Sequence, residues 1–326
     1  MPEPTFKINT GVYNRVVLEM VEPKGGKRFV GNRSACRYCG TKNQADFGRR
    51  RNAHLFPAAL GNEILFALNE CKTCNNKFSV YEDALSKAVG PFLTLGGVRG
   101  RKGVRKTGRS EGKSKIRHSS DGEERRLSIT SNGMLRGHFG TDHSSGVVTI
   151  RFPVEGDAFV PRYAYKALLK IAISMLPEAE LPNFANAIGC LSLQDDTPHD
   201  GPLQVGFSYA LVGNAPPVLA GCLLRRTENE LPLPYMIFVF MAGSVCFQIW
   251  VKSDKADAHV PNVGKLGIQY TTQFRKPEGG YLPVRFSDPM QFDWSDNGSI
   301  LQPFEFFDLR HNPQTQIGEI IPVPRR

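Results

Sequence analysis

The chain has 326 residues, 41 Lys and Arg against 31 Asp and Glu, and a formal net charge of +10. Hydrophobic residues make up 40% of the chain, which excludes a wholly disordered protein, a collagen and a small disulfide scaffold. Its length predicts about two domains. No apolar run reaches the roughly 18 residues of a membrane span, and the first residues lack the apolar core of a signal peptide, so we expect a cytoplasmic protein that binds no membrane.

The positive charge is concentrated in two parts of the chain. Residues 27–51 contain eight basic residues and one acid, and residues 99–126 contain eleven basic residues and four acids. Concentrated basic charge is typical of proteins that bind phosphate-rich partners, so we expect a nucleic acid as partner. The residues expected to contact it are Arg49, Arg50, Arg51, Lys77, Arg99, Arg101, Lys102, Arg105 and Lys106. A basic loop that is merely solvated is the alternative.

Four of the seven cysteines form two Cys-x-x-Cys pairs, Cys36 with Cys39 and Cys71 with Cys74. Two intervening residues let one tight turn present both sulfurs to a tetrahedral ion, and a second pair completes the shell. In a chain without a secretory signal, this spacing predicts a structural Zn²⁺ site rather than disulfides. Redox or chance pairs are the alternative. The remaining cysteines are expected to be small buried hydrophobes: Cys190, Cys222 and Cys246.

The stretch between the two pairs carries the candidate chemistry. The chain reads HLFPAALGN from His54 to Asn62, and Asn75 directly follows the second pair. Over residues 36–88 this arrangement resembles the HNH endonuclease family in its zinc-knuckle form. The resemblance implies a ββα-metal domain, in which a two-stranded ribbon carries His54 and a following helix carries Asn75.

The resemblance also implies roles for these two residues. His54 would be the general base that activates water, a role that suits an imidazole because it titrates near neutral pH. Asn75 would be a ligand of a catalytic Mg²⁺ or Mn²⁺, which takes oxygen donors and keeps several waters. The expected substrate is DNA rather than RNA.

The chain departs from the family pattern at two positions. Many family members carry an acidic ligand directly before the catalytic histidine, where this chain has Ala53. Many also carry an asparagine five residues before the third cysteine, where this chain has Phe66; Asn62 or Asn69 could take over its orienting hydrogen bond. Three residues are candidates for a second oxygen ligand: Asn52, Asn76 and Glu82. A degenerate, inactive knuckle is the alternative.

A helix is predicted after the second cysteine pair, capped by Thr73 or Asn75 and ending near Gly90-Pro91. Four apolar residues at helical spacing predict its buried face: Phe78, Tyr81, Leu85 and Val89. Residues 96–126 are rich in glycine and basic side chains. They predict an arm or linker beside the nuclease site that becomes ordered on nucleic acid.

The second half of the chain predicts a β-rich α+β domain. Strands are expected at 127–130, 134–139, 147–152, 203–212, 218–226, 235–241 and 245–252, the last two as a hairpin. Residues 162–176 predict an apolar helix with one polar stripe, formed by Arg162, Lys166, Lys170 and Ser174. We expect this stripe to face water; a ridge that follows phosphates is the alternative.

The predicted fold class is therefore α+β, with a small zinc-braced HNH domain at 1–95, the basic arm at 96–126 and an accessory domain at 127–326. The accessory domain would grip nucleic acid, sense a ligand or dock a partner. The predicted function is metal-dependent hydrolysis of phosphodiester bonds, in a phage, mobile-element or antiviral defence setting that the resemblance suggests. Two alternatives stay open: a non-catalytic zinc-knuckle protein that binds nucleic acid, and a nuclease subunit active only with a protein partner.

Overall fold

The computed structural model has an α+β architecture, with several antiparallel sheets and four α-helices in its described part. The predicted α+β class is thereby confirmed. The described residues are 4–8, 11–21, 25–48, 52–95, 98–100, 103–104, 115–121, 124–130, 139–153, 156–192, 203–209, 219–260, 270–275, 281–285, 287, 290–312 and 317–324.

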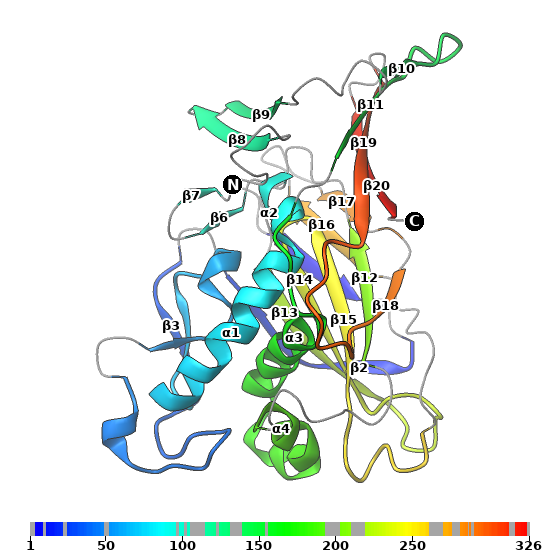
Figure 1. Cartoon of the computed structure of the whole chain (residues 1–326). Helices are drawn as coiled ribbons and strands as arrows, with labels where there is room; N and C mark the ends of the chain where they lie inside the picture. Colours follow the sequence, from blue (N-terminus) through cyan, green and yellow to red (C-terminus); the bar gives the residue numbers. More distant parts are fainter. Residues whose placement is uncertain are drawn as a thin grey trace.

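A six-stranded antiparallel sheet forms the centre of the fold (Figure 1). Its strands, in spatial order, are β18 (Met290–Asp293), β12 (Gln204–Tyr209), β15 (Val245–Val251), β14 (Met236–Ala242), β13 (Leu219–Arg226) and β2 (Tyr13–Met20). β14 is buried along its whole length, as its unbroken apolar run MIFVFMA requires. The predicted hairpin is confirmed, since β14 pairs with β15 through a turn in which Gly243 has a φ of +62°.

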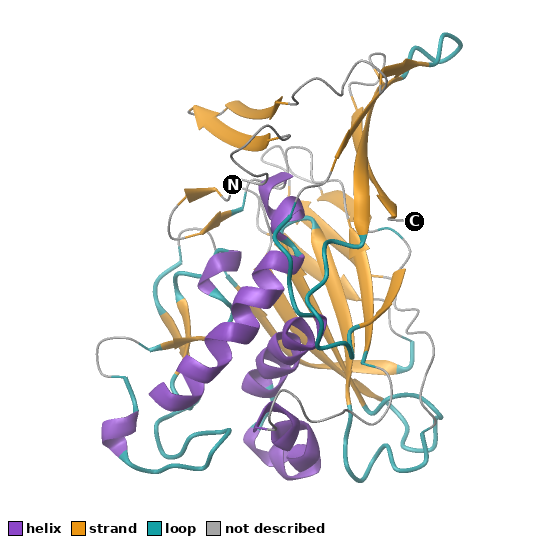
Figure 2. Cartoon of the chain, viewed as in Figure 1, coloured by secondary structure: helices purple, strands orange, loops and turns teal. Residues whose placement is uncertain are grey.

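The helices gather on one side of this sheet (Figure 2). They are α1 (Lys72–Ala88), α2 (Gly90–Leu95), α3 (Pro161–Met175) and α4 (Ala185–Ser192), with 3-10 turns at η1 (Gln44–Asp46), η2 (Ala58–Leu60) and η4 (Glu178–Phe184). α3 contacts β13 and β15 of the sheet and also packs against α1. Within the described ranges, none of the helices has the length and apolar content needed to span a bilayer.

A small three-stranded sheet lies beside α1. It consists of β3 (Arg28–Val30), β5 (Leu65–Ala67) and β4 (Ala53–His54), in that order. β3 runs parallel to β5, and β4 runs antiparallel to it. This sheet and the start of α1 carry most of the residues that the sequence singles out.

The remaining strands form peripheral sheets and hairpins. One sheet contains β10 (Phe139–Thr141), β11 (Val148–Pro153), β19 (Phe304–Asn312) and β20 (Ile317–Pro324), and another contains β1 (Pro4–Ile8), β16 (Tyr270–Arg275) and β17 (Tyr281–Arg285). Two further pairs lie in the predicted basic arm or extend past its end at residue 126: β6 (Arg99–Gly100) with β7 (Gly103–Val104), and β8 (Lys115–Asp121) with β9 (Glu124–Thr130). The arm therefore contains short hairpins that its glycine-rich composition did not predict.

The first two strands of the chain share sheets with its second half. β2 pairs with β13, and β1 pairs with β16. One continuous core of buried side chains extends from Cys36 to Phe307. The first ninety-five residues are thus built into the same packing unit as the second half, while the domain boundaries at 95 and 126 stay a prediction.

The prediction that the polar stripe of α3 faces water is wrong. Lys166, Lys170 and Ser174 are only 3%, 0% and 1% exposed. The reason is that α1 packs over this face of α3. Burial also rules out the alternative of a ridge along which these lysines bind phosphates.

Candidate metal centre and adjoining pocket

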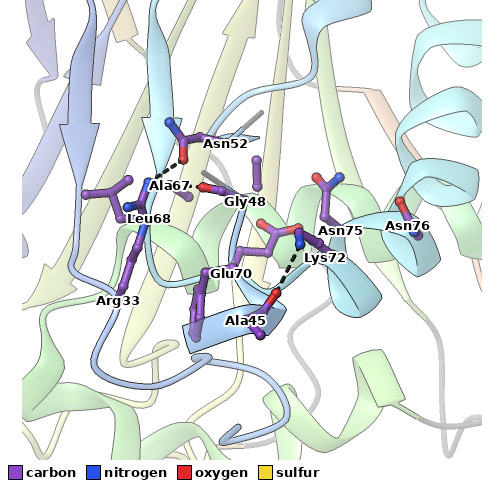
Figure 3. A pocket seen from close by; sticks show the side chains of 12 residues that line it. Arg33, Ala45, Gly48, Asn52, Ala67, Leu68, Glu70, Lys72, Asn75 and Asn76 are labelled. Atoms are coloured by element: carbon purple, nitrogen blue, oxygen red, sulfur yellow. Dashed lines mark hydrogen bonds between the residues drawn. The ribbon is translucent and has the colours of Figure 1, made fainter. Parts of the chain in front are cut away.

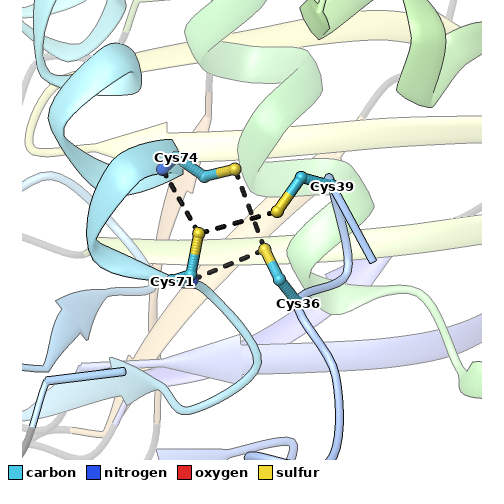
Figure 4. A group of neighbouring side chains, drawn as sticks. All are labelled: Cys36, Cys39, Cys71 and Cys74. Atoms are coloured by element: carbon cyan, nitrogen blue, oxygen red, sulfur yellow. Dashed lines mark hydrogen bonds between the residues drawn. The ribbon is translucent and has the colours of Figure 1, made fainter. Parts of the chain in front are cut away.

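The four paired cysteines meet at one point (Figure 4). Their sulfurs all lie within 4.8 Å of one another; Cys36 Sγ is 3.8 Å from Cys74 Sγ, and Cys39 Sγ is 3.7 Å from Cys71 Sγ. Four sulfurs placed tetrahedrally at a Zn–S distance of about 2.3 Å would be about 3.8 Å apart. The tetrad is therefore consistent with a structural Zn²⁺. Its four thiolates would fill the tetrahedral shell and leave no coordination position for water or substrate.

Local turns present these sulfurs. Gly40 donates its backbone N–H to the Cys36 carbonyl at 2.9 Å and has a φ of +74°, which closes the first turn with a residue that tolerates this conformation. Cys71 is the N-cap of α1, and its sulfur accepts the N–H of Cys74 at 3.5 Å. The predicted cap at Thr73 or Asn75 is wrong, because this sulfur starts the helix earlier. The predicted buried face of α1 and its end before Gly90 are confirmed.

Hydrogen bonds favour the charged form of one ligand. The pKa of Cys36 is lowered to about 4, first by the hydrogen bond from the Cys74 side chain and then by the backbone N–H groups of Cys39, Cys71 and Tyr38. The thiolate is the form that binds metal. The pKa of Cys71 is raised by burial and that of Cys74 by its hydrogen bond with Cys36, so without an ion the cluster favours one thiolate beside neighbouring thiols.

The two residues between Cys36 and Cys39 fasten the cluster to α3. The Arg37 guanidinium donates to three carbonyls at the end of that helix, those of Ile173 at 2.8 Å, Ser174 at 3.0 Å and Leu176 at 2.6 Å. The Tyr38 hydroxyl donates to the Lys170 carbonyl at 3.0 Å. The last carbonyls of a helix lack the full set of helical partners, so the first knuckle serves as a C-terminal cap of α3.

A pocket of about 760 Å³ lies between the small sheet and the start of α1 (Figure 3). Its described lining contains Arg33, Ala45, Phe47, Gly48, Asn52, Ala53, Ala67, Leu68, Glu70, Lys72, Asn75 and Asn76. The predicted ligand Asn75 is thus in the pocket, as are the candidates Asn52 and Asn76. Ala53, which stands where the family has an acidic ligand, lines the same pocket.

His54 lies on the opposite face of its strand. Adjacent residues of a strand point to opposite faces, and Ala53 lines the pocket while His54 is not among the described lining residues. The His54 ring instead packs on Phe66, its direct partner across the strands, with ring centroids 4.9 Å apart. The structure therefore brings Asn75 and Ala53 together, and places His54 behind them on the edge strand β4.

The asparagines considered as orienting groups have other partners. Asn62 is fully buried; its amide donates to the carbonyls of Phe56 and Leu65 at 2.8 and 2.7 Å and accepts the Leu65 N–H at 2.9 Å. With its amide oxygen turned toward Arg37, Asn69 accepts from that guanidinium at 2.9 and 3.1 Å. Asn62 thus shapes the turn between β4 and β5, and Asn69 orients Arg37.

Glu82 has a role different from the predicted one. Its carboxylate accepts a hydrogen bond from Lys170 Nζ at 3.0 Å, and the same ammonium donates to the His54 carbonyl at 3.1 Å. Burial by itself lowers the pKa of Lys170, but the neighbouring carboxylates of Glu70 and Glu82 raise it overall. The ammonium stays charged, and Glu82 is its counter-ion on α1.

Sequence reasoning did not find Glu70. This residue is buried in the pocket lining, and its carboxylate lies 3.0 Å from Lys170 Nζ. Burial raises the pKa of Glu70 to about 7, against the effect of Lys170. The only signal in the sequence is an acidic residue directly before Cys71, which is too common to stand out.

Most of the basic residues predicted to contact nucleic acid lie outside the described residues: Arg49, Arg50, Arg51, Arg101, Lys102, Arg105 and Lys106. Arg99 lies in β6 and its side chain is likewise not described, whereas Lys77 is exposed on α1. The chain matches no protein-family model, no curated protein and no solved structure. Its function must therefore be argued from the chemistry of this site.

Proposed function

We propose that this protein is a metal-dependent endonuclease of the HNH type, which hydrolyses phosphodiester bonds in nucleic acid, DNA above all. The observation that carries the proposal is that Ala53 and Asn75 line one pocket. In the HNH family that the chain resembles, these are the two positions that hold the catalytic ion, one on the ribbon and one on the helix. They converge here although they are separated by the stretch that forms β5 and the second knuckle.

The polar donors of the pocket suit a hard divalent ion. Asn75, Asn52 and Asn76 offer amide oxygens, a donor type that Mg²⁺ and Mn²⁺ accept. Asn52 is already oriented, because its Oδ1 accepts from Arg33 Nη2 at 2.8 Å. Such an ion, when bound, stabilises negative charge on the phosphate and on the leaving oxygen.

His54 is proposed as the general base. β4 is an edge strand among the described strands of its sheet, so a phosphodiester at this edge can contact Asn75 on the pocket side and His54 on the other side. The His54 imidazole would accept a proton from the attacking water. Lys170 positions this residue by donating to its carbonyl, which fixes the strand.

The test is cleavage of circular double-stranded DNA with Mg²⁺ or Mn²⁺. We expect His54→Ala to lose activity by about 100-fold or more, the usual contribution of a general base. Asn75→Ala should also lose activity, because it removes an oxygen ligand of the ion. His259→Ala and Asn229→Ala are matched controls at exposed positions and should cleave like the wild type. Cleavage that persists in His54→Ala, or a zinc-loaded wild type that does not cleave, contradicts the proposal.

A non-catalytic protein that binds nucleic acid is the second candidate. It is favoured by Ala53 and Phe66, which replace the acidic ligand and the asparagine of the family pattern. This candidate predicts that the wild type binds DNA without cutting it and that His54→Ala changes nothing. A partner-gated nuclease subunit would differ from both, since its cleavage would begin only when the partner protein is added.

A further inference from the structure

Three aromatic side chains form a row across the small sheet, one from each strand. Phe29 of β3 and His54 of β4 both stand directly opposite Phe66 of β5. The Phe29 and Phe66 rings stack with centroids 5.7 Å apart and an interplanar angle of 26°, and the Phe66 and His54 rings follow at 4.9 Å. All three rings therefore share one face of the sheet, the face turned away from the pocket.

The outer end of this row is open to solvent. Phe29 is 51% exposed, so its ring reaches the surface. Phe66 and His54 are partly exposed behind it. A planar ligand could stack on the exposed Phe29 ring. It would then extend the row of rings that ends at His54, the proposed general base.

The charge around the row indicates which planar ligand fits. Lys27, two residues before Phe29, is exposed, and Arg28 between them is also exposed and pairs with Glu19. A nucleic-acid strand supplies both complements at once, phosphates for the basic groups and base faces for the ring. Bases within a duplex already stack on each other, so only unpaired bases offer their faces.

We propose that the exposed Phe29 ring, supported by Phe66 and His54 behind it, forms a stacking platform for an unpaired base of a single strand bound beside the proposed site. This inference deepens and rests on the proposed function, because it names the substrate class of that site: nucleic acid that is single-stranded or locally unpaired. Stacking on a ring is tolerant of sequence, so the platform selects unpaired structure rather than a base sequence.

The test is a binding measurement without added divalent ions, so that it does not depend on cleavage. Full-length protein is titrated into a fluorescent single-stranded oligonucleotide, the same strand with abasic sites at its centre, and the matching duplex, and anisotropy is recorded. We expect Phe29→Ala to bind the intact strand about 5- to 150-fold more weakly than the wild type does, the usual effect of losing one base–aromatic stack. On the abasic strand, which keeps its phosphates, the two proteins should bind alike.

Two further variants control for surface and fold. Phe29→Trp should keep the affinity for the intact strand, because it keeps an aromatic face. Val80→Ala removes an apolar side chain that is equally exposed, at 52%, but lies on α1, and it should bind like the wild type. Equal binding by Phe29→Ala and wild type on the intact strand, or equal losses on the intact and abasic strands, overturns the platform.

The outcomes separate this inference from the proposed function. Base-dependent binding through Phe29 in a protein that never cleaves supports the platform and overturns the nuclease. Cleavage that needs His54 while Phe29→Ala binds normally supports the nuclease and overturns the platform. A wild type that binds neither strand nor duplex overturns the platform and leaves Phe29 as a surface for a protein.

Discussion

The ammonium of Lys170 lies 3.0 Å from a carboxylate oxygen of Glu70, and neither side chain is exposed to solvent. Lys170 comes from α3 in the second half of the chain, whereas Glu70 directly precedes the third cysteine of the tetrad. The same ammonium binds Glu82 of α1 and the carbonyl of His54. One buried charge thus holds together the strand, the helix and the knuckle of the candidate site.

We expect Lys170→Met to lower the free energy of unfolding by about 3–5 kcal/mol, because it leaves the Glu70 carboxylate buried without a counter-ion. Adding Glu70→Gln should recover part of this loss, since it removes the stranded charge. Lys87→Met is the control: its pair with Asp83 is 2.7 Å long but solvent-exposed, and should contribute about 1 kcal/mol or less. Urea unfolding of the wild type, the two single variants and the double variant measures these differences. An unchanged free energy of unfolding in Lys170→Met would show that the buried pair contributes no net stability.

Zinc content tests the cysteine tetrad. We expect about one zinc per purified chain, and its loss in Cys36→Ser or Cys74→Ser, because a structural site needs all four thiolates. Removal of the metal by a chelator should lower the unfolding temperature, since the binding free energy contributes to folding. Cys190→Ser should keep its zinc, because Cys190 is half-buried and lies outside the tetrad. A metal-free chain that unfolds at an unchanged temperature would exclude a structural metal.

Arg37→Ala should separate stability from metal binding. The guanidinium caps α3 and is not a zinc ligand, so we expect an unchanged zinc content and a free energy of unfolding lower by about 3 kcal/mol. Arg225→Ala removes a guanidinium that is 46% exposed and pairs with Glu180, so it should cost about 1 kcal/mol at most. Zinc analysis and urea unfolding of the same samples check both effects. Loss of zinc in Arg37→Ala would mean that docking on α3 is needed to form the site.

Ala53→Asp restores the carboxylate that the family pattern has. If Ala53 and Asn75 flank the ion, this variant should need about tenfold less Mg²⁺ for half-maximal cleavage, a gain of about 1.4 kcal/mol. Ala45→Asp adds the same charge elsewhere in the pocket, beside Lys72, whose ammonium donates to the Ala45 carbonyl at 3.0 Å. We expect a smaller change there. The measurement is the cleavage rate as a function of Mg²⁺ concentration. If Ala53→Asp and the wild type need the same Mg²⁺ concentration for half-maximal cleavage, the proposed ion position is contradicted.

The sequence predicted those elements whose signal is local. The helix at 72–88, the hairpin at 236–251 and the four-cysteine tetrad each follow from periodicity or spacing within a short stretch. The side-chain stripe of Lys166, Lys170 and Ser174 was equally visible, but a stripe only marks a face as different from the rest. Whether water or another helix covers that face depends on α1, which is distant in the chain.

The sequence by itself determined the tetrad, the helix that follows it, the strand-rich second half and the excess of basic charge. Tertiary structure alone decided that β2 joins the central sheet, that Glu70 and Lys170 pair in the core, and that His54 faces Phe66 rather than the pocket. The physical reason is that each of these depends on pairing between distant segments. Such pairings are selected by the total burial and charge compensation of the fold, which no short stretch encodes.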